Sequence, residues 1–132
     1  MEKWKEVFGG IIPKAVYQVQ LINGEKQGLT IKLLSSQTCV MINFGMVQAV
    51  RMLDEGIVQS NLYSENEIRK YKDNDFQNII YEVQDGKFLE QINQISDGYG
   101  EALNLKHYVV ITQNYNIDIA TEWEPTIEIL KM

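Results

Sequence analysis

The chain has little of the residue types that build recognisable catalytic or cross-linked sites. Its 132 residues include one cysteine, one histidine and two prolines. A lone cysteine cannot form an intramolecular disulfide, and the apolar neighbours of Cys39 favour a buried thiol over a reactive one. A domain of this size buries enough surface to fold without disulfides or a structural metal.

Long apolar runs are also missing. No stretch approaches the length of apolar sequence that a membrane-spanning helix needs, and the charged start Met1–Glu6 lacks the apolar segment of a signal peptide. We therefore expect a cytoplasmic protein without a membrane partner.

Positive charge is scarce. The 12 basic residues are outnumbered by 18 acidic ones, which gives a formal net charge of −6, and no Lys/Arg cluster rises above this background. Because nucleic-acid binding depends on neutralising phosphates, we expect no nucleic-acid partner. The same acidity favours encounter with a basic protein surface, although it is also an ordinary solubility feature.

Motifs for hydrolysis, metal binding and phosphate binding are absent. Histidine-dependent chemistry would have to use His107, and no G-x-S-x-G elbow accompanies it. No H-x-x-x-H, C-x-x-C or EF-hand spacing occurs, and the glycines form neither G-x-G-x-x-G nor G-K-[ST]. We therefore expect no metal and no cofactor, and a binding protein in preference to an enzyme.

What the sequence does contain is repeated β-type alternation within one domain, residues 1–132. It predicts an α+β fold, with a predominantly antiparallel sheet of meander or sandwich type. Residues 46–53 fit a strand best, although their apolar spacing also permits a helix. The predicted strands are 15–21, 29–34, 38–44, 46–53, 78–83, 108–112, 115–119 and 126–130.

Two helices are predicted around these strands. Lys87–Ser96 carries an apolar stripe that should cover one face of the sheet. The stripe consists of Phe88, Leu89, Ile92 and Ile95. Residues 2–9 fit a short N-terminal helix within a docking segment, residues 1–14, and the polar stretch 60–75 is expected to be an exposed excursion with a helical turn near Ser64.

Two acidic loops are the predicted binding surface. Asp54 and Glu55 follow a predicted strand, while Glu122, Trp123 and Glu124 precede the strand-breaking Pro125. Trp123 would be a desolvated anchor on a basic partner, and the carboxylates would speed encounter. The competing interpretation is that Trp123 belongs to the core.

An alternative site combines His107 with Asp118. A pocket holding this histidine and two carboxylates would favour a small-molecule-binding protein or an enzyme that also uses the acidic loop residues. The separations of those carboxylates cannot be determined from the sequence.

Several scattered positions resemble small uncharacterised bacterial proteins of immunity or accessory type that are encoded near polymorphic toxins. They are Arg51-x-x-Asp54-Glu55-Gly56, the helix around Phe88–Ser96, His107-Tyr108, and Asn116-Ile117-Asp118 before Pro125. The resemblance spans about residues 38–130 and implies a non-enzymatic role in binding another protein. It assigns no functional residues.

Overall fold

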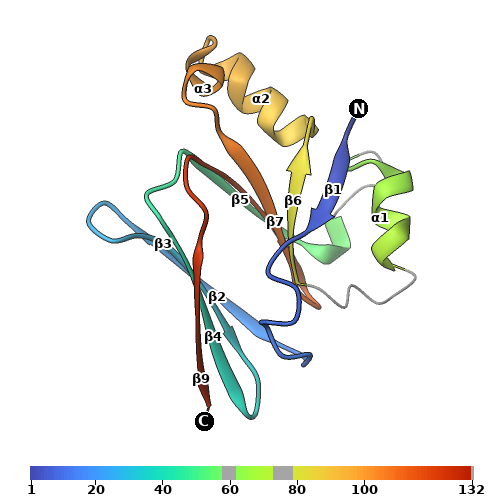
Figure 1. The fold of residues 1–132 in the computed structure, drawn as a ribbon, viewed down its shortest axis with the longest axis vertical. Helices are drawn as coiled ribbons and strands as arrows, with labels where there is room; N and C mark the ends of the chain where they lie inside the picture. The colour runs from blue at the N-terminus through green and yellow to red at the C-terminus, as the bar shows by residue number, and fades with distance from the viewer. Residues whose placement is uncertain (58–61, 73–78, 132) are drawn as a thin grey trace.

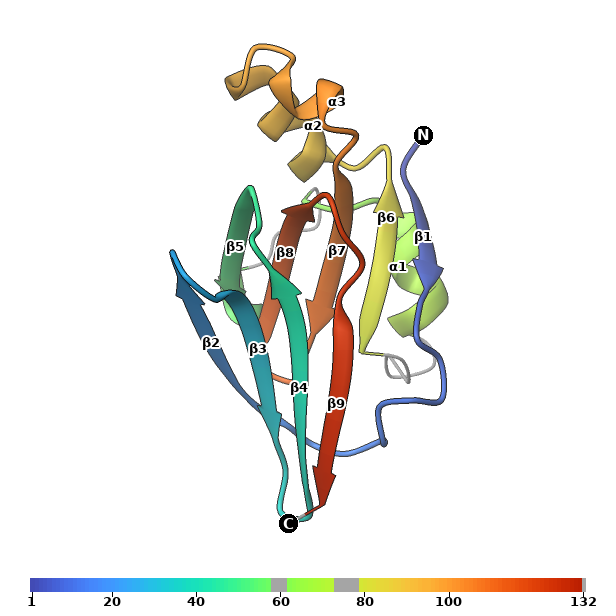
Figure 2. The ribbon, with the colours of Figure 1, turned by 60° about the vertical axis from the view of Figure 1, so that its left-hand side comes forward.

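The protein is built from two antiparallel β-sheets packed face to face (Figures 1 and 2). The computed structural model describes residues 1–57, 62–72 and 79–131. The five-stranded sheet has the order β1 (Lys3–Glu6), β6 (Ile80–Gln84), β7 (Lys106–Ile111), β8 (Tyr115–Thr121) and β5 (Ala49–Asp54). The four-stranded sheet has the order β2 (Gln18–Gly24), β3 (Gly28–Leu34), β4 (Thr38–Gly45) and β9 (Thr126–Lys131). The predicted α+β class is confirmed.

The main core lies between the two sheets. The inward-facing positions alternate along each strand, as the sequence predicts, and they interdigitate in a single apolar layer. Its fully buried members include Leu29, Ile31, Leu33, Val40, Ile42, Ile80, Val110, Ile117 and Ile119. The alternating apolar residues of the sequence therefore face the core on the inner side of each sheet.

A second apolar layer covers the outer face of the five-stranded sheet. Helix α1 (Glu65–Lys72) and the segment before it lie there, so the predicted excursion 60–75 is partly a covering helix; residues 58–61 and 73–78 lie outside the described part. The backbone N–H of Trp4 donates to Glu67 Oε1 at 2.9 Å, and the Trp4 indole donates to Glu2 at 2.8 Å. The Ser64 N–H also donates to Glu2, which ties β1 to the start of α1.

The predicted N-terminal helix is wrong, because residues 3–6 form the edge strand β1 on β6. In a helix, Trp4 and Phe8 would share a face. Instead Trp4 packs in the outer layer, opposite Val83 in the register, whereas Phe8 packs against the core between the sheets. The chain changes sides after β1, and Phe8 has the unusual φ of 57°. Pairing with β6 and burial of the indole outweigh the weak helical spacing.

Helix α2 (Lys87–Ile95) confirms the predicted helix, and the short α3 (Tyr99–Ala102) follows it. Both lie at one end of the sandwich (Figure 2), so α2 covers the ends of β7 and β8 rather than a whole sheet face. Phe88 is buried, Leu89 and Ile92 are partly buried, and Ile95 is 73% exposed. The stripe is therefore buried only in the first two turns. None of the helices in the described ranges is long and apolar enough to cross a membrane.

Two connections carry the chain between the sheets at this same end. Residues 46–48 join β4 to β5, and residues 122–125 join β8 to β9. The Gln48 N–H donates to the Ala120 carbonyl at 2.9 Å, and Thr121 Oγ1 lies 3.5 Å from the Met46 carbonyl. The strand predicted at 46–53 consequently begins only at Ala49, because its first three residues cross from one sheet to the other. We call this place the inter-sheet corner.

Gly28 provides a test of the tight approach between the β2–β3 hairpin and the end of β4. Its φ is +76°, and an added Cβ would lie 2.1 Å from the Gly45 carbonyl carbon. We expect Gly28→Ala to lower the free energy of unfolding by about 3 kcal/mol or more, because strain and backbone collision combine. Gly45→Ala is the matched control, with φ +73° and no atom within 4 Å of its Cβ. Left-handed strain alone should cost it about 1 kcal/mol. Equal losses in denaturant titrations would contradict the steric argument.

Candidate functional site

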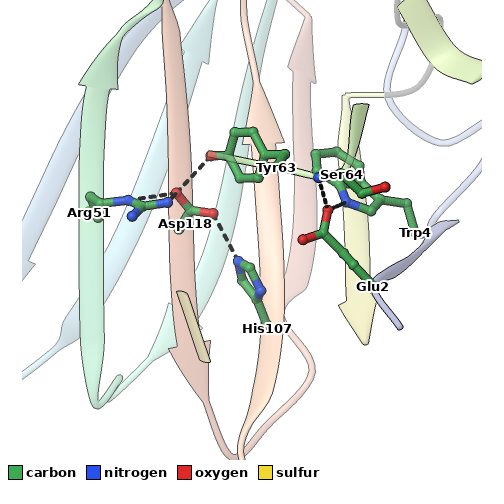
Figure 3. Close-up of polar contacts among 7 residues, drawn as sticks. All are labelled: Glu2, Trp4, Arg51, Tyr63, Ser64, His107 and Asp118. Carbon is green, nitrogen blue, oxygen red and sulfur yellow. Dashed lines mark hydrogen bonds and ion pairs between the residues drawn. The ribbon is translucent and has the colours of Figure 1, made fainter. Parts of the chain in front are cut away.

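A buried polar cluster lies on the outer face of the five-stranded sheet (Figure 3). It consists of Arg51, Tyr63, His107 and Asp118. Asp118 is fully buried and His107 is 1% exposed. The structure therefore brings together the two residues of the alternative site.

The strand register explains why these side chains meet. Asp118 of β8 is directly opposite Arg51 of β5 on one side and Val109 of β7 on the other. His107 is two residues before Val109, so it projects from the same face and lies diagonal to Asp118. Cross-strand neighbours at these positions are within reach of long and aromatic side chains.

Within the described ranges, the hydrogen bonds that join the side chains of the cluster converge on the Asp118 carboxylate. Oδ2 accepts from Arg51 Nη2 at 2.6 Å, from Arg51 Nε at 3.0 Å and from the Tyr63 hydroxyl at 2.8 Å. Oδ1 lies 2.8 Å from His107 Nε2. Because a carboxylate paired with a guanidinium can only accept hydrogen bonds, His107 Nε2 completes the set as an N–H donor.

Helix α2 closes the cluster from above through Phe88. The Phe88 ring centroid lies 5.1 Å from that of His107, and the Arg51 Cζ lies 4.9 Å from the Phe88 centroid. The guanidinium is thus held between a carboxylate and an aromatic face, which is a favourable place for a delocalised cation.

Burial and charge set the ionisation of the cluster. Burial raises the pKa of the Tyr63 hydroxyl, and the neighbouring Asp118 charge raises it further. For Arg51, burial disfavours the charged form, but the ion pair with Asp118 outweighs this and leaves its pKa raised. Tyr63 therefore stays a hydroxyl donor and Arg51 a cation.

The remaining ring nitrogen, His107 Nδ1, is buried and has no hydrogen-bond partner among the described residues. It faces Gly86, where a Cβ would lie 3.1 Å from Nδ1 and 2.8 Å from Val83 Cγ1. A carboxylate-bound imidazole is the arrangement of a general base, but a base needs a substrate within hydrogen-bond reach. Among the described residues, Gly86 lies against this side of the imidazole, and it leaves little room even for a Cβ beside Nδ1.

Two open hollows on the described surface lie away from the polar cluster. One, of about 420 Å³, is an open depression beside Tyr17, Leu34 and Asn114, and another, of about 410 Å³, follows the β2–β3 turn. Neither is lined by His107 or Asp118. Within the described ranges, no group of three or more His, Cys, Asp and Glu side chains is placed to hold a metal ion.

The structure separates the two predicted acidic loops. Asp54 pairs with Tyr115 at the start of β8, and the Glu55 N–H donates to the Asn114 carbonyl at 2.8 Å. Glu122–Glu124 follows the opposite end of the same strand. The separation equals the length of the seven-residue β8, so the loops cannot form one contiguous surface.

Trp123 lies at the inter-sheet corner and is 65% exposed, so the competing core interpretation does not hold. The backbone N–H of Trp123 donates to Thr121 Oγ1 at 3.4 Å. The backbone carbonyl of Met46 lies beside the same hydroxyl, and Met46 is 54% exposed. Of its acidic neighbours, Glu122 accepts from Gln48 Nε2 at 3.0 Å and Glu124 lies 4.0 Å from Lys106 Nζ. The corner thus presents two large apolar side chains beside two carboxylates.

In comparisons with known proteins, the chain matches no family model, no curated protein and no solved structure. The resemblance to immunity-type proteins therefore stays a prediction.

The polar cluster gives a stability prediction for Asp118→Asn. The amide would place an N–H₂ group or an uncharged oxygen against the donors of three side chains and leave Arg51 without its counterion. Breaking one side of a buried ion pair costs about 3–5 kcal/mol, so we expect a loss in this range by chemical denaturation. The exposed Glu25→Gln should change stability by less than about 0.5 kcal/mol. A similarly small effect for Asp118→Asn would contradict the central position of the carboxylate.

Alkaline pH should weaken the fold partly through Tyr63. Its pKa is raised in the folded state, whereas an unfolded tyrosine titrates near pH 10. The stabilisation that Tyr63 provides is therefore complete below about pH 10. It is lost as pH rises above about 10, because the unfolded chain then binds fewer protons than the folded protein. In denaturant titrations, Tyr63→Phe should reduce the alkaline slope of stability by up to about 1.4 kcal/mol per pH unit. An unchanged slope would show that Tyr63 ionises equally in both states.

Proposed function

We propose that this chain is a non-enzymatic, cytoplasmic protein-binding domain of immunity or accessory type, and that the inter-sheet corner is its contact surface. The residues proposed to contact the partner are Met46, Glu122, Trp123 and Glu124. The observation that carries the proposal is the exposed indole of Trp123 between two carboxylates.

The composition of the corner supports a protein partner. Tryptophan and methionine are enriched where protein interfaces bury their centre, and hot spots are enriched in tryptophan. A largely exposed indole with its backbone fixed by the Thr121 hydroxyl is a preorganised anchor that loses little conformational freedom on binding. Carboxylates on either side favour a basic patch on the partner, in agreement with the net charge of −6.

The position of His107 also favours binding over catalysis. The only histidine is buried in the polar cluster, where it contacts Asp118. The acidic loops that an enzyme would combine with it lie at the two opposite ends of β8. A cytoplasmic location suits the single buried cysteine, which needs no oxidising compartment.

Trp123→Ala tests the anchor. We expect capture of the partner from source-cell extract by the immobilised chain to fall strongly, with the purified pair dissociating at least about tenfold faster, because the loss of a desolvated anchor mainly affects the dissociation rate. Melting temperature should be unchanged, since the side chain is 65% exposed. Tyr99→Ala is the matched control, because Tyr99 is also 65% exposed but belongs to α3. Undiminished affinity in Trp123→Ala would remove the corner as the binding surface.

Charge neutralisation separates steering from anchoring. The double variant Glu122→Gln and Glu124→Gln should lower the association rate several-fold at low salt and leave dissociation nearly constant. Asp54→Asn with Glu55→Gln removes the same charge from the far end of β8 and should have a smaller effect. Equal effects of the two pairs would indicate that only the overall charge matters.

A further inference from the structure

The outer face of the four-stranded sheet is a second surface without a described cover. Helix α1 contacts β1, and α2 contacts β7 and β8, all of which belong to the other sheet. Figures 1 and 2 agree that no described helix lies on the outer side of β2, β3, β4 and β9. This face is therefore available to a second molecule.

The register arranges the side chains of this face in rows centred on β4. The β4 positions on the side away from the core are Cys39, Met41 and Asn43, because Val40 and Ile42 fill the inter-sheet layer. Cys39 is only 6% exposed, so Met41 and Asn43 are the β4 side chains that this face presents. Each outward residue is opposite one residue of β3 and one of β9. The rows are Leu34–Cys39–Leu130, Lys32–Met41–Glu128 and Thr30–Asn43–Thr126.

The middle row carries opposite charges on the two sides of an apolar residue. Lys32 and Glu128 both pair with Met41, from β3 and β9 respectively, and so are two strands apart. Within the described ranges neither of them forms an ion pair. Two unpaired, opposite charges placed symmetrically about a central residue make the face self-complementary.

The symmetry that satisfies these charges is specific. A two-fold axis parallel to β4, lying between two stacked faces, places Lys32 of each copy opposite Glu128 of the other. The same axis puts Met41 on Met41 and Leu34 opposite Leu130 of the second copy. A two-fold axis perpendicular to the strands would instead oppose Lys32 with Lys32 and Glu128 with Glu128, which is unfavourable.

We propose that two copies of this chain associate through the outer faces of their four-stranded sheets, with Met41 on the two-fold axis and two reciprocal Lys32–Glu128 ion pairs. Stacking of aligned sheets about 10 Å apart is an established packing mode. Only β3, β4 and β9 overlap in this arrangement, an area of about 14 by 20 Å. Because this is below the size of most permanent interfaces, the dimer is weak and depends on concentration.

Charge-exchange variants test this arrangement in the full-length chain. Lys32→Glu or Glu128→Lys alone should weaken self-association at least about tenfold in sedimentation velocity over a concentration series, because both intermolecular pairs become repulsive. The double variant, Lys32→Glu with Glu128→Lys, carries the same two charges in exchanged positions and should restore self-association. Lys26→Glu, in the β2–β3 turn, is the control with the same change of charge and should associate like the wild type.

Mixing the two single variants gives the sharpest result. A heterodimer of Lys32→Glu with Glu128→Lys regains both ion pairs, so the mixture should associate although neither variant does so alone. This outcome depends on the reciprocal pairing and cannot arise from a folding defect, which melting curves of each variant would reveal independently. A wild type that stays monomeric into the millimolar range, or single variants that dimerise like the wild type, would overturn the proposal. A mixture that associates no more strongly than either single variant alone would also overturn it.

Discussion

The Asp118 carboxylate is the constraint on which the outer half of the molecule depends. A fully buried charge is tolerated only when a counterion and hydrogen-bond donors surround it. Here the counterion comes from β5, one donor from β7 and one from the segment before α1, while α2 contributes the ring that closes the site. One carboxylate thus sets the positions of elements that are up to 67 residues apart in the chain.

The inner half of the fold follows from local pattern, and the outer half does not. Alternation in the sequence predicts which side of each strand faces the core between the sheets, and Ile117 and Ile119 lie there as expected. The same alternation assigns Asp118 to a solvent-facing side, yet that side is covered by Tyr63 and α2. A period of two distinguishes the faces of a strand, but it does not say whether a later segment will cover the polar one.

The pairing of His107 with Asp118 could be predicted from the sequence, because both flank a short hairpin whose register places them on the same face of the sheet. The contacts of Arg51 and Tyr63 could not be predicted, because sequential order does not determine that β5 becomes the neighbour of β8 or that the segment before α1 covers the outer face. The N-terminal segment shows the same limit: its apolar spacing fits a helix locally, but pairing with β6 divides Trp4 and Phe8 between two cores.

The buried cluster also determines the geometry of the inter-sheet corner. Strand β5 is an edge strand, and edge strands are prone to slip in register because only one neighbour holds them. A shift by one residue would place Val50 or Met52 opposite Asp118 and leave the carboxylate without its counterion. The large cost of such an unpaired charge favours a single register. That register fixes where β5 begins, and with it the connection that brings Met46 beside Thr121 and Trp123. The closed polar cluster therefore acts at a distance on the exposed corner, because the register that it favours fixes the crossing that brings Met46 to the proposed binding surface.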